Sequence, residues 1–588
     1  MIDDLTHTAL AVTKDTVLRI LNDIGLLLEL KGENPFKSRA YYQAARALEK
    51  ESGDIADLVA TGAISSIKSI GPAIAKKLTE LVTTGRLDYY EQLKASIPPG
   101  CIEMLKAPGL GPKKIHILCN VLGIATLSEL ERACRENRLL DLPGFGQKTQ
   151  EKILAGIEQV KSYRDRYLFA SVAGRAEELT GFLRVQEGVT AVETAGSLRR
   201  LCETVKDIDV VAASAAPEIL ADAFAAMPSV AQVTAKGATK VSVRLSSGIA
   251  ADLRIVSPGQ FPYALHHFTG SKDHNTALRG RAKRMGFKLN EYGLFEGERL
   301  IHCSTEEELF GALGLCFIPP ELREAMGEIE AAEGSAIPDL IDMKDVKGLL
   351  HVHTDMSDGS DSLERIVSAA RAMGLSYIGI ADHSISAAYA GGLSEEAVKR
   401  QHALIDEIMA RHPSPHIFKG IEAEILADGS LDFSDDILET FDFVIAAVHS
   451  HFSMSAEAMT NRILTALDNP LTAILAHPTG RLLLARKPYA VDIDRVIDRA
   501  VEHSVAIELN ANPLRLDLDW RQIRQALGKG ALIAINPDSH RAADLKDIRF
   551  GLNIARKGWM TPKHCLNCLD VKEIGDVFSR KRNRRRKS

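Results

Sequence analysis

Three segments near the N-terminus share one arrangement of hydrophobic and polar positions. Each has an apolar residue, a tight turn that contains glycine, and then a helical pattern with a basic start. The segments are SIKSIGPAIAKKLTEL (66–81), KAPGLGPKKIHILCNVLG (106–123) and LDLPGFGQKTQEKILAGI (140–157). Glycine permits the positive φ that a tight turn between two helices needs. The pattern therefore predicts a helical N-terminal part built from pairs of helices.

Around residue 168 the pattern changes to short apolar runs that are rich in β-branched residues. These runs predict strands over 207–213, 239–246 and 250–256. Because side chains alternate between the faces of a strand, Asp207 and Asp209 are expected on one face, with Asp252 on a neighbouring strand. Carboxylates held together are costly unless a cation neutralises them, and Mg²⁺ prefers oxygen ligands. The three acids therefore predict a Mg²⁺ site.

Beyond a linker at 319–347, apolar β-rich runs alternate with helical patterns. We expect strands near 348–352, 376–381, 416–421, 442–448, 472–476, 504–509 and 531–536. Seven strands with intervening helices are typical of parallel βα units that form a closed or nearly closed barrel.

Polar side chains, most of them possible metal ligands, follow all seven of these strands. They are His351, His353, Asp358, Asp382, His383, Glu422, His449, His477, Asn510, Asp538 and His540. The carboxyl ends of the strands form the rim where such barrels build active sites. Mixed imidazole and carboxylate ligands suit Mn²⁺, Zn²⁺ or Fe rather than Ca²⁺. Because one ion cannot use so many ligands, the pattern predicts a cluster of two or three metals, which would generate hydroxide and clamp phosphate oxygens.

The composition is that of a globular chain with several domains. Its 588 residues correspond to about three to five domains. With 45% hydrophobic and 26% charged residues, a disordered or fibrous chain is excluded. The net charge is −6: residues 1–320 hold 39 basic and 38 acidic residues, and the remainder holds 33 and 40. Twelve of the 18 histidines also lie beyond residue 320, so this acidic half is expected to bind metal cations.

The sequence also bears on the protein's compartment. No run approaches 18 uncharged apolar residues, and the start MIDDLTHTALAVTKD lacks a signal-peptide pattern, so we expect no membrane span. Eight scattered cysteines are typical of reduced thiols in the cytoplasm. Cys565 and Cys568 form the one Cys-x-x-Cys pair, which without a second pair is more often incidental than a zinc site. The basic tail SRKRNRRRKS (579–588) is expected to be disordered, and is either a DNA tether or a solvated tail without a role.

Two further features offer hydrogen-bond donors to phosphate. The repeated turns expose backbone N–H groups beside a helix N-terminus, where a phosphate can sit without any base being read. The glycines concerned are Gly71, Gly109, Gly111, Gly144 and Gly146. Ahead of Asp207, a second turn begins at Gly196 and continues with Ser197 and two arginines, which add a hydroxyl and a guanidinium fork.

Taken together, residues 1–318 resemble the family X DNA polymerases. The repeated turns resemble helix-hairpin-helix units. The other motifs in family order are Gly-Ser-x-Arg-Arg (196–200), Asp-x-Asp (207–209), Asp252, Phe-Thr-Gly-Ser (268–271) and Asn-Glu-Tyr-Gly (290–293). The resemblance implies that Asp207 and Asp209 bridge two metal ions, Mg²⁺ or Mn²⁺, and that Asp252 holds the catalytic one. It also implies that Ser197 and Arg200 contact the triphosphate.

The same resemblance implies the contacts to the sugar and the base. His267 and Phe268 would pack under the sugar, next to Gly270. Asn275 would reach the minor-groove edge of the base, and Arg279 the template side. Many family members have tyrosine where this chain has His267, so we expect looser discrimination between sugars.

The family's lyase domain is kept in part. Lys37 and Tyr41 match its 5′-phosphate pocket, and Lys77 matches its Schiff-base lysine. Ala73 occupies a position where a phosphate-binding lysine is usual. A lysine beside Lys76 can have the lowered pKa that a nucleophile needs, but two lysines on a solvated helix that faces DNA are an equal alternative.

The second half, at about 348–575, resembles the PHP (polymerase and histidinol phosphatase) domain. The matching motifs are His-x-His-Thr-x-x-Ser-Asp-Gly (351–359), Ala-Asp-His (381–383), Gly-Ile-Glu (420–422), Val-His-Ser (448–450), Ala-His-Pro (476–478) and Asp-Ser-His (538–540). The resemblance implies nine metal ligands, all present: His351, His353, Asp358, His383, Glu422, His449, His477, Asp538 and His540. His451 is an additional histidine that we expect near the substrate or behind the ligands.

A family X core followed by a PHP domain resembles the bacterial-type family X polymerases. That resemblance implies synthesis from dNTPs on gapped or primed DNA during repair, including base excision repair, by a cytoplasmic, nucleoid-associated monomer. It also implies a Mn²⁺-dependent 3′→5′ exonuclease, with AP endonuclease or 3′-phosphatase activity as further options. The alternatives are a DNA-end-binding protein whose two sites are structural, or a polymerase whose PHP half acts on small phosphate esters.

The expected architecture is multidomain, with helical helix-hairpin-helix domains, an α+β nucleotidyltransferase palm and a C-terminal distorted (βα)₇ barrel. The expected divisions are a lyase-like domain (1–85), a second helix-hairpin-helix subdomain (86–162), the palm (163–257), a nucleotide-closing subdomain (258–318), the linker (319–347), the PHP domain (348–575) and the tail (576–588).

Overall fold

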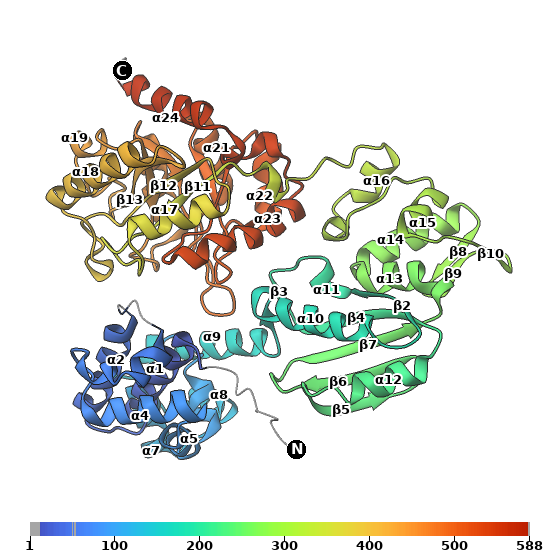
Figure 1. Ribbon diagram of the computed structural model, residues 1–588, viewed down its shortest axis with the longest axis horizontal. Coiled ribbons are helices and arrows are strands. Elements are labelled where there is room, and N and C mark those ends of the chain that lie inside the picture. Colours follow the sequence, from blue (N-terminus) through green and yellow to red (C-terminus); the bar gives the residue numbers. More distant parts are fainter. Residues whose placement is uncertain (1–11, 50, 52–53, 586–588) are drawn as a thin grey trace, which may run out of the picture. The chain divides into compact units, whose positions relative to one another are not determined.

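The computed structural model describes residues 12–49, 51 and 54–585 of the chain (Figure 1). The chain divides into two compact units, Met1–Arg164 and Asp165–Ser588, each held together mainly by contacts within itself. Among the described residues, no helix is both long enough and apolar enough to cross a membrane.

The first unit is built from helices. They are α1 (Lys14–Leu30), α2 (Pro35–Glu49), α3 (Ile55–Ala60), the 3₁₀ helix η1 (Ala63–Ser66), α4 (Pro72–Thr84), α5 (Asp88–Ala95), α6 (Pro99–Met104), α7 (Pro112–Leu122), α8 (Leu127–Arg135) and α9 (Gln147–Tyr163). One hydrophobic core runs through the unit, from Ile24 in α1 to Ile157 in α9. Residues 12–49 and the later helical turns are therefore stabilised by the same core.

The three repeated turns share one backbone geometry. Helices α4, α7 and α9 each begin directly after an extended glycine, namely Gly71, Gly111 and Gly146. Two residues earlier the backbone is left-handed, with φ of 78° at Ser69, 88° at Gly109 and 84° at Gly144. The sequence repeat therefore corresponds to a structural repeat, in which Ser69 adopts the conformation that glycine takes in the other two copies.

A five-stranded sheet, in the order β2-β4-β7-β6-β5, opens the second unit. The strands are β2 (Val189–Thr194), β4 (Asp207–Ser214), β5 (Val230–Lys236), β6 (Lys240–Leu245) and β7 (Ala250–Val256), and the packed helices are α10 (Phe169–Arg184) and α12 (Pro217–Ala225). A two-stranded pair, β1 (Tyr167–Leu168) and β3 (Thr204–Val205), lies beside it. The central strands match the sequence prediction. The edge strands β2 and β5 were not predicted, because few of their side chains are fully buried and they give no apolar run.

The next segment combines helices with a small antiparallel sheet. Helices α13 (Phe261–Thr269), α14 (Lys272–Arg284) and α15 (Glu306–Ala312) surround β8 (Phe287–Asn290), β9 (Gly293–Glu296) and β10 (Arg299–Ile301). A separate core holds them together, with Tyr263, Leu278, Leu294 and Phe310 fully buried. The following residues form η3 (Pro320–Leu322) and α16 (Glu328–Glu333), so the linker is partly helical.

Seven parallel strands in sequence order form the rest of the unit. They are β11 (Gly348–Val352), β12 (Tyr377–Ile380), β13 (His416–Glu424), β14 (Phe443–Ala447), β15 (Thr472–Leu475), β16 (Ala506–Asn510) and β17 (Ile533–Asn536). The first and last strands approach each other: the Ser539 N–H donates to the His351 carbonyl at 3.3 Å, and the His353 N–H donates to the Ser539 carbonyl at 2.9 Å. This confirms the predicted, nearly closed barrel.

Helices cover the outside of the barrel, as Figure 1 shows. The longer ones are α17 (Leu363–Ala372), α18 (Glu395–Arg411), α20 (Ala456–Asp468), α21 (Ile493–Glu502), α22 (Trp520–Gly528), α23 (Ile548–Lys557) and α24 (Val571–Arg585). The expectation of a disordered tail was wrong for residues 579–585, because α24 continues to Arg585; residues 586–588 lie outside the described residues. Helix α24 buries Ile574 and Phe578, and the Phe578 ring stacks 5.1 Å from Phe443 at the barrel.

Replacing Phe578 by alanine tests whether α24 is an integral part of the barrel. Because the ring is 1% exposed, we expect Phe578→Ala to lower the free energy of unfolding of this half by about 3–5 kcal/mol. Both tryptophans, Trp520 and Trp559, lie in this half, so their fluorescence during urea unfolding reports on it. Lys572→Ala, an exposed position on the same helix, should change the value by less than about 0.5 kcal/mol. An equal effect of both variants would contradict the docking of α24.

Candidate active sites

Three carboxylates gather on one face of the five-stranded sheet. Strands β4 and β7 are parallel neighbours, and Asp209 stands directly beside Asp252, with Asp207 two residues earlier on β4. Burial raises the pKa of Asp209 to about 6, and the charges of Asp207 and Asp252 add to the rise. Burial, and then the charge of Asp252, also raises the pKa of Asp207. Mutual repulsion of this kind is relieved by a bound cation, so the geometry fits the predicted metal site.

Lys240 is an unpredicted member of this cluster. It opens β6, and its Nζ lies 2.7 Å from Asp252 Oδ2. Strand β6 pairs with β7 so that Ser242 stands opposite Asp252, which brings the lysine two residues away along the strand. The sequence holds only a weak signal for this contact, because the pairing of β6 with β7 is needed to see it.

The turn at Gly196 is packed against the acids. Its φ is 59°, and a Cβ atom there would lie 2.1 Å from Asp209 Oδ2, so no other residue fits without movement. The Ala195 N–H donates to the Asp209 carbonyl at 2.8 Å. The short helix α11 (Gly196–Arg199), which includes Ser197, is thereby held beside the acidic face.

The two arginines after Ser197 are engaged with the segment that follows the sheet. Arg199 donates to Thr269 Oγ1 at 2.8 Å and to Glu306 Oε2 at 2.6 Å. Arg200 donates from Nε to Glu324 Oε1 at 3.0 Å and from Nη1 to the Thr269 carbonyl at 2.7 Å. Two nitrogens of Arg200 are therefore committed to protein acceptors, which fixes the guanidinium in place.

The predicted sugar and base contacts lie on α13 and α14. The rings of His267 and Phe268 are 5.0 Å apart, and burial lowers the pKa of the His267 imidazole. Asn275 Nδ2 donates to the His267 carbonyl at 2.7 Å, while Asn275 Oδ1 is buried without a hydrogen-bond partner. A Cβ at Gly270 would lie 2.5 Å from that oxygen. Arg279 Nε donates to the Asn275 carbonyl at 3.2 Å.

The lyase candidates in the first unit meet at an aromatic residue that the sequence did not single out. The rings of Tyr41 and Tyr89 stack 6.4 Å apart, and Lys77 Nζ lies 4.5 Å from the Tyr89 ring centroid. Burial, together with Tyr89, raises the pKa of the Tyr41 hydroxyl. Lys37 instead pairs with Glu33 at 3.1 Å. The structure thus brings Tyr41 and Lys77 to one place.

The helix-starting glycines of the repeated turns face open space. A Cβ atom at Gly71, Gly111 or Gly146 would have no neighbour within 4 Å. Their φ values of −76°, −90° and −90° do not require glycine. The room that they leave beside three helix N-termini suits a phosphate backbone.

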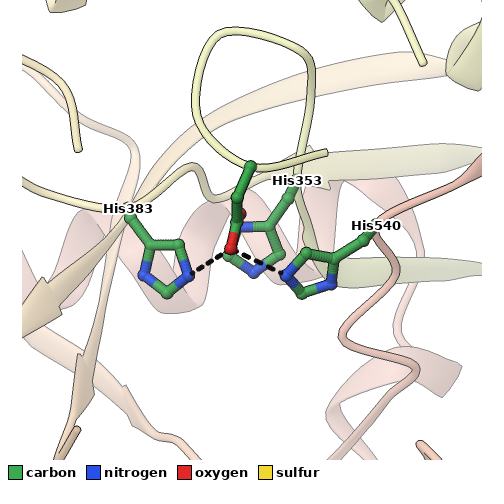
Figure 2. A group of neighbouring side chains, drawn as sticks. His353, His383 and His540 are labelled. Atoms are coloured by element: carbon green, nitrogen blue, oxygen red, sulfur yellow. Dashed lines mark ion pairs between the residues drawn. The ribbon is translucent and has the colours of Figure 1, made fainter. Parts of the chain in front are cut away.

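At the carboxyl ends of the barrel strands, the nine predicted ligands converge. Eight of them fall into three overlapping groups whose ligand atoms lie within 4.8 Å of one another: His353, Asp358, His383 and His540; His351, His353 and Asp538; and His383, Glu422 and His449. The ninth, His477, places Nε2 3.1 Å from Glu422 Oε1. Figure 2 shows the rings of His353, His383 and His540 facing one another, and Asp358 Oδ2 lies 3.5 Å from His383 Nε2 and 3.3 Å from His540 Nε2.

Buried atoms in this cluster have chemistry that fits metal cations. Both nitrogens of His353, the Nε2 of His351 and the Oε2 of Glu422 are buried without a hydrogen bond, which is unfavourable unless another partner satisfies them. Burial lowers the pKa of His353 to about 3, so its imidazole is neutral, the form that binds a metal. Burial opposes charge on His383 as well, but Glu422 and Asp358 outweigh it and raise its pKa to about 10. Because metal ligands must be deprotonated, metal uptake is expected to release protons.

Carboxylates behind the ligands orient the imidazoles, and the sequence analysis missed them. Glu424 Oε2 lies 2.9 Å from His449 Nδ1, and Glu508 Oε1 lies 2.7 Å from His351 Nδ1. Such contacts turn the other ring nitrogen toward a metal. A signal existed for Glu424, because it follows Glu422 by two residues on a strand and therefore shares its face.

Other residues complete the rim of the cluster. Asn510 is not a ligand in this geometry but a support, since its Nδ2 donates to Asp538 Oδ2 at 3.0 Å. Arg515 Nε lies 3.6 Å from the same oxygen. Tyr389 is 71% exposed, with its ring 6.0 Å from His383 and 6.3 Å from His449. An exposed aromatic ring and a cation thus flank the nine ligands.

Comparisons with known proteins cover both halves. Family models match a helix-hairpin-helix domain (13–87), a SAM-like helix-hairpin-helix tandem (102–159), a DNA polymerase beta thumb (264–324) and a PHP domain (350–512). The DNA polymerase/3′-5′ exonuclease PolX of Bacillus subtilis (strain 168) is 38% identical over 571 residues, which span 96% of this chain and 99% of the relative. A probable phosphatase of Caldicellulosiruptor saccharolyticus is 30% identical over 33% of this chain and 80% of its own length. Probable phosphatase YcdX of Escherichia coli (strain K12) is 26% identical over 37% of this chain and 88% of its own length.

Replacing Glu422 tests the metal cluster without an activity assay. Its carboxylate lies within 3.5 Å of His351, His383, His449 and His477, so its loss affects several ligand groups at once. We expect Glu422→Gln to weaken Mn²⁺ binding by at least about tenfold, measured by isothermal titration calorimetry. Asp436→Asn, an exposed acid on the same half, should bind Mn²⁺ as the original protein does. Unchanged stoichiometry and affinity in Glu422→Gln would exclude this carboxylate as a ligand.

Proposed function

The chain belongs to the family X DNA polymerases that carry a C-terminal PHP domain, and on that premise we propose that it fills short gaps in DNA during repair and removes nucleotides from 3′ ends. Residues 163–318 would carry synthesis and residues 348–575 hydrolysis. The observation that carries the proposal is the presence of two complete ligand sets, the acidic triad on β4 and β7 and the nine ligands at the rim of the barrel.

Synthesis would take place over the acidic face of the five-stranded sheet. Asp207, Asp209 and Asp252 would hold Mg²⁺ or Mn²⁺. When bound, these ions supply the charge that lowers the pKa of the primer 3′-hydroxyl and stabilises the leaving pyrophosphate. The N–H groups of α11 and the Ser197 hydroxyl would orient the triphosphate, because Gly196 fixes that helix directly beside Asp209. Positioning of this kind accounts for much of the catalysis of phosphoryl transfer.

The nucleotide itself would be held by α13 and α14. Phe268 is a flat apolar surface for the sugar, and Arg254 stacks on it 4.9 Å away. Asn275 Oδ1, buried and without a hydrogen bond, is an acceptor in the region expected to face the base. His267 is smaller than tyrosine and is neutral because burial lowers its pKa. We therefore expect weaker exclusion of ribonucleotides than a tyrosine would give.

The helical first unit would grip DNA without reading its sequence. Three helix N-termini behind exposed glycines offer backbone N–H groups to phosphates, and phosphate contacts carry no sequence information. A repair enzyme has to bind gaps in any sequence, so this mode of binding suits the proposed role. Both ligand sets come from one chain, which supports action as a monomer.

Hydrolysis would take place at the rim of the barrel. The nine ligands would hold two or three ions, Mn²⁺, Zn²⁺ or Fe, which when bound supply a hydroxide and bind phosphate oxygens. Glu424 and Glu508 would keep the imidazoles of His449 and His351 in one orientation. Arg515 would attract the phosphate, since its guanidinium lies at the edge of the cluster.

A second substrate class for the barrel is supported by the comparisons. Relatives named probable phosphatases match a third of the chain. Removal of a 3′-terminal phosphate, or cleavage at an abasic site, would use the same ions and the same hydroxide. A purely structural role for either half is less consistent with ligand sets that lack no member.

Two alanine variants should separate the two reactions. Asp209→Ala removes a metal-holding carboxylate from the sheet, and His353→Ala removes a neutral ligand that belongs to two groups at the barrel. We expect Asp209→Ala to lose gap filling by at least about a hundredfold and to keep degradation in Mn²⁺, and His353→Ala to do the reverse. One labelled gapped duplex, with and without dNTPs, serves both assays.

The thermal unfolding midpoint of both variants should stay near that of the original protein. Misfolding would then be excluded as the cause of either lost activity. Degradation that persists in His353→Ala, or disappears in Asp209→Ala, would refute the assignment of one reaction to each half.

A lyase activity at Lys77 has its own test. If Lys77 attacks a 5′-deoxyribose phosphate, borohydride should trap the protein on such an end, and Lys77→Ala should abolish trapping. Lys76→Ala is the matched control, because this exposed neighbour lies on the same helix. The Lys77 ammonium lies 4.5 Å from the Tyr89 ring centroid, so both variants should also be checked for unchanged thermal unfolding. Absence of any adduct with the unaltered protein would eliminate this activity.

A further inference from the structure

We propose that the PHP domain takes part in nucleotide binding at the palm through Lys557, which acts as a positioning residue. Because Lys557 pairs with the same carboxylate as Arg200, it leaves the group around Arg200 with a net positive charge that attracts the triphosphate. The inference rests on the proposed polymerase function. It concerns a contact between two domains of the second unit, and it adds a role for the PHP domain that does not involve hydrolysis.

Lys557 is the last residue of α23 and is 1% exposed. Its ammonium donates to the carboxylate of Glu324, to the Arg200 carbonyl at 3.1 Å and to the Glu321 carbonyl at 3.4 Å. It also lies 4.9 Å from the Trp520 ring centroid. A buried ammonium is unfavourable unless it is paired. All three of its oxygen partners lie outside the barrel, in the palm and in the segment that follows the closing subdomain.

Glu324 is shared by two cations. The Glu324 Oε1 that accepts from Lys557 also accepts from Arg200 Nε at 3.0 Å. Burial opposes the charge of this carboxylate, but Lys557 and Arg200 outweigh the effect and lower its pKa. The group of three therefore holds two positive charges and one negative charge. Without Lys557, Glu324 would neutralise Arg200, and the group would have no net charge to offer a triphosphate.

The docking of α23 fixes this arrangement. Arg556 donates to Glu321 Oε1 at 2.8 Å, on the same residue whose carbonyl accepts from Lys557. A second contact lies three residues after Arg200 in the palm, where Arg481 Nη2 of the PHP domain lies 3.5 Å from Glu203 Oε1. The PHP domain thus holds both ends of residues 200–203, which connect the Gly-Ser turn to the strand that carries Asp207. Two chain segments of the barrel, far apart in sequence, converge on one loop of the nucleotide site.

A double-mutant experiment separates this charge effect from simple mechanical support. KM and kcat for one dNTP are measured on a one-nucleotide gap with the full chain, for Lys557→Met, Glu324→Gln and the double variant. We expect Lys557→Met to raise KM about tenfold with kcat within about twofold, the size of a lost contact between a charge and phosphate. Glu324→Gln keeps an acceptor for Arg200 and should leave KM equal to or below that of the original protein.

The double variant decides between the two explanations. Removing one positive and one negative charge restores the net charge of the group, so its KM should return to within about twofold of the original value. Degradation of single-stranded DNA in Mn²⁺ should be unchanged in all three variants, because Lys557 is not part of the nine-ligand cluster.

Three results would overturn the inference: an unchanged KM in Lys557→Met, a double variant with the raised KM of Lys557→Met, or a KM above the original value in Glu324→Gln. The comparison of Glu324→Gln with the original protein remains valid even if Lys557→Met fails to fold. Loss of nuclease activity in Lys557→Met would reveal such a failure. Failure of the unaltered protein to extend a primer would instead refute the proposed function itself.

Discussion

The packing of ionisable side chains against one another on parallel strands is the constraint on which both halves of this protein depend. On the five-stranded sheet, the register of β4 and β7 places Asp209 beside Asp252 and raises the pKa of Asp209 to about 6. At the barrel, Glu422 lies buried among four imidazoles. In each case the sheet supplies the rigidity that keeps like groups together, and cations are the simplest way to stabilise the result. Cations bound at these clusters would in turn attract the negatively charged oxygens of phosphate esters.

The two halves are linked by charges that belong to neither metal site. Lys557 donates to the Arg200 carbonyl in the palm and to the Glu324 carboxylate in the segment that follows the closing subdomain. Arg481 pairs with Glu203 in the palm. A fusion of two enzymes would need only a flexible linker, whereas buried ion pairs between them require a fixed docking. The PHP domain thus contacts the palm at Arg200 and Glu203, which gives a physical reason for a fixed arrangement of the two domains.

Several features of the sites were predictable, and the failures have a common cause. The acidic triad and the nine barrel ligands are placed by strand alternation and by the positions of strand ends, which are local properties. The protein partners of the Arg200 guanidinium were not predicted, because Glu324 and Thr269 come from more than sixty residues away. The order in the tail was also missed, since it depends on Phe578 packing against Phe443 at the barrel.

By itself, the sequence determined the fold class, the central strands, the three repeated turns and the set of candidate metal ligands that the structure brings together, because each depends on short-range periodicity or on a motif within a few residues. Tertiary structure alone decided which residues surround those ligands. Lys240 reaches Asp252 only through the pairing of β6 with β7, Glu508 reaches His351 across 157 residues of chain, and Lys557 reaches Arg200 across 357. Groups that are so far apart along the chain interact only after folding has brought them within a few ångströms, and no local pattern along the chain records that step.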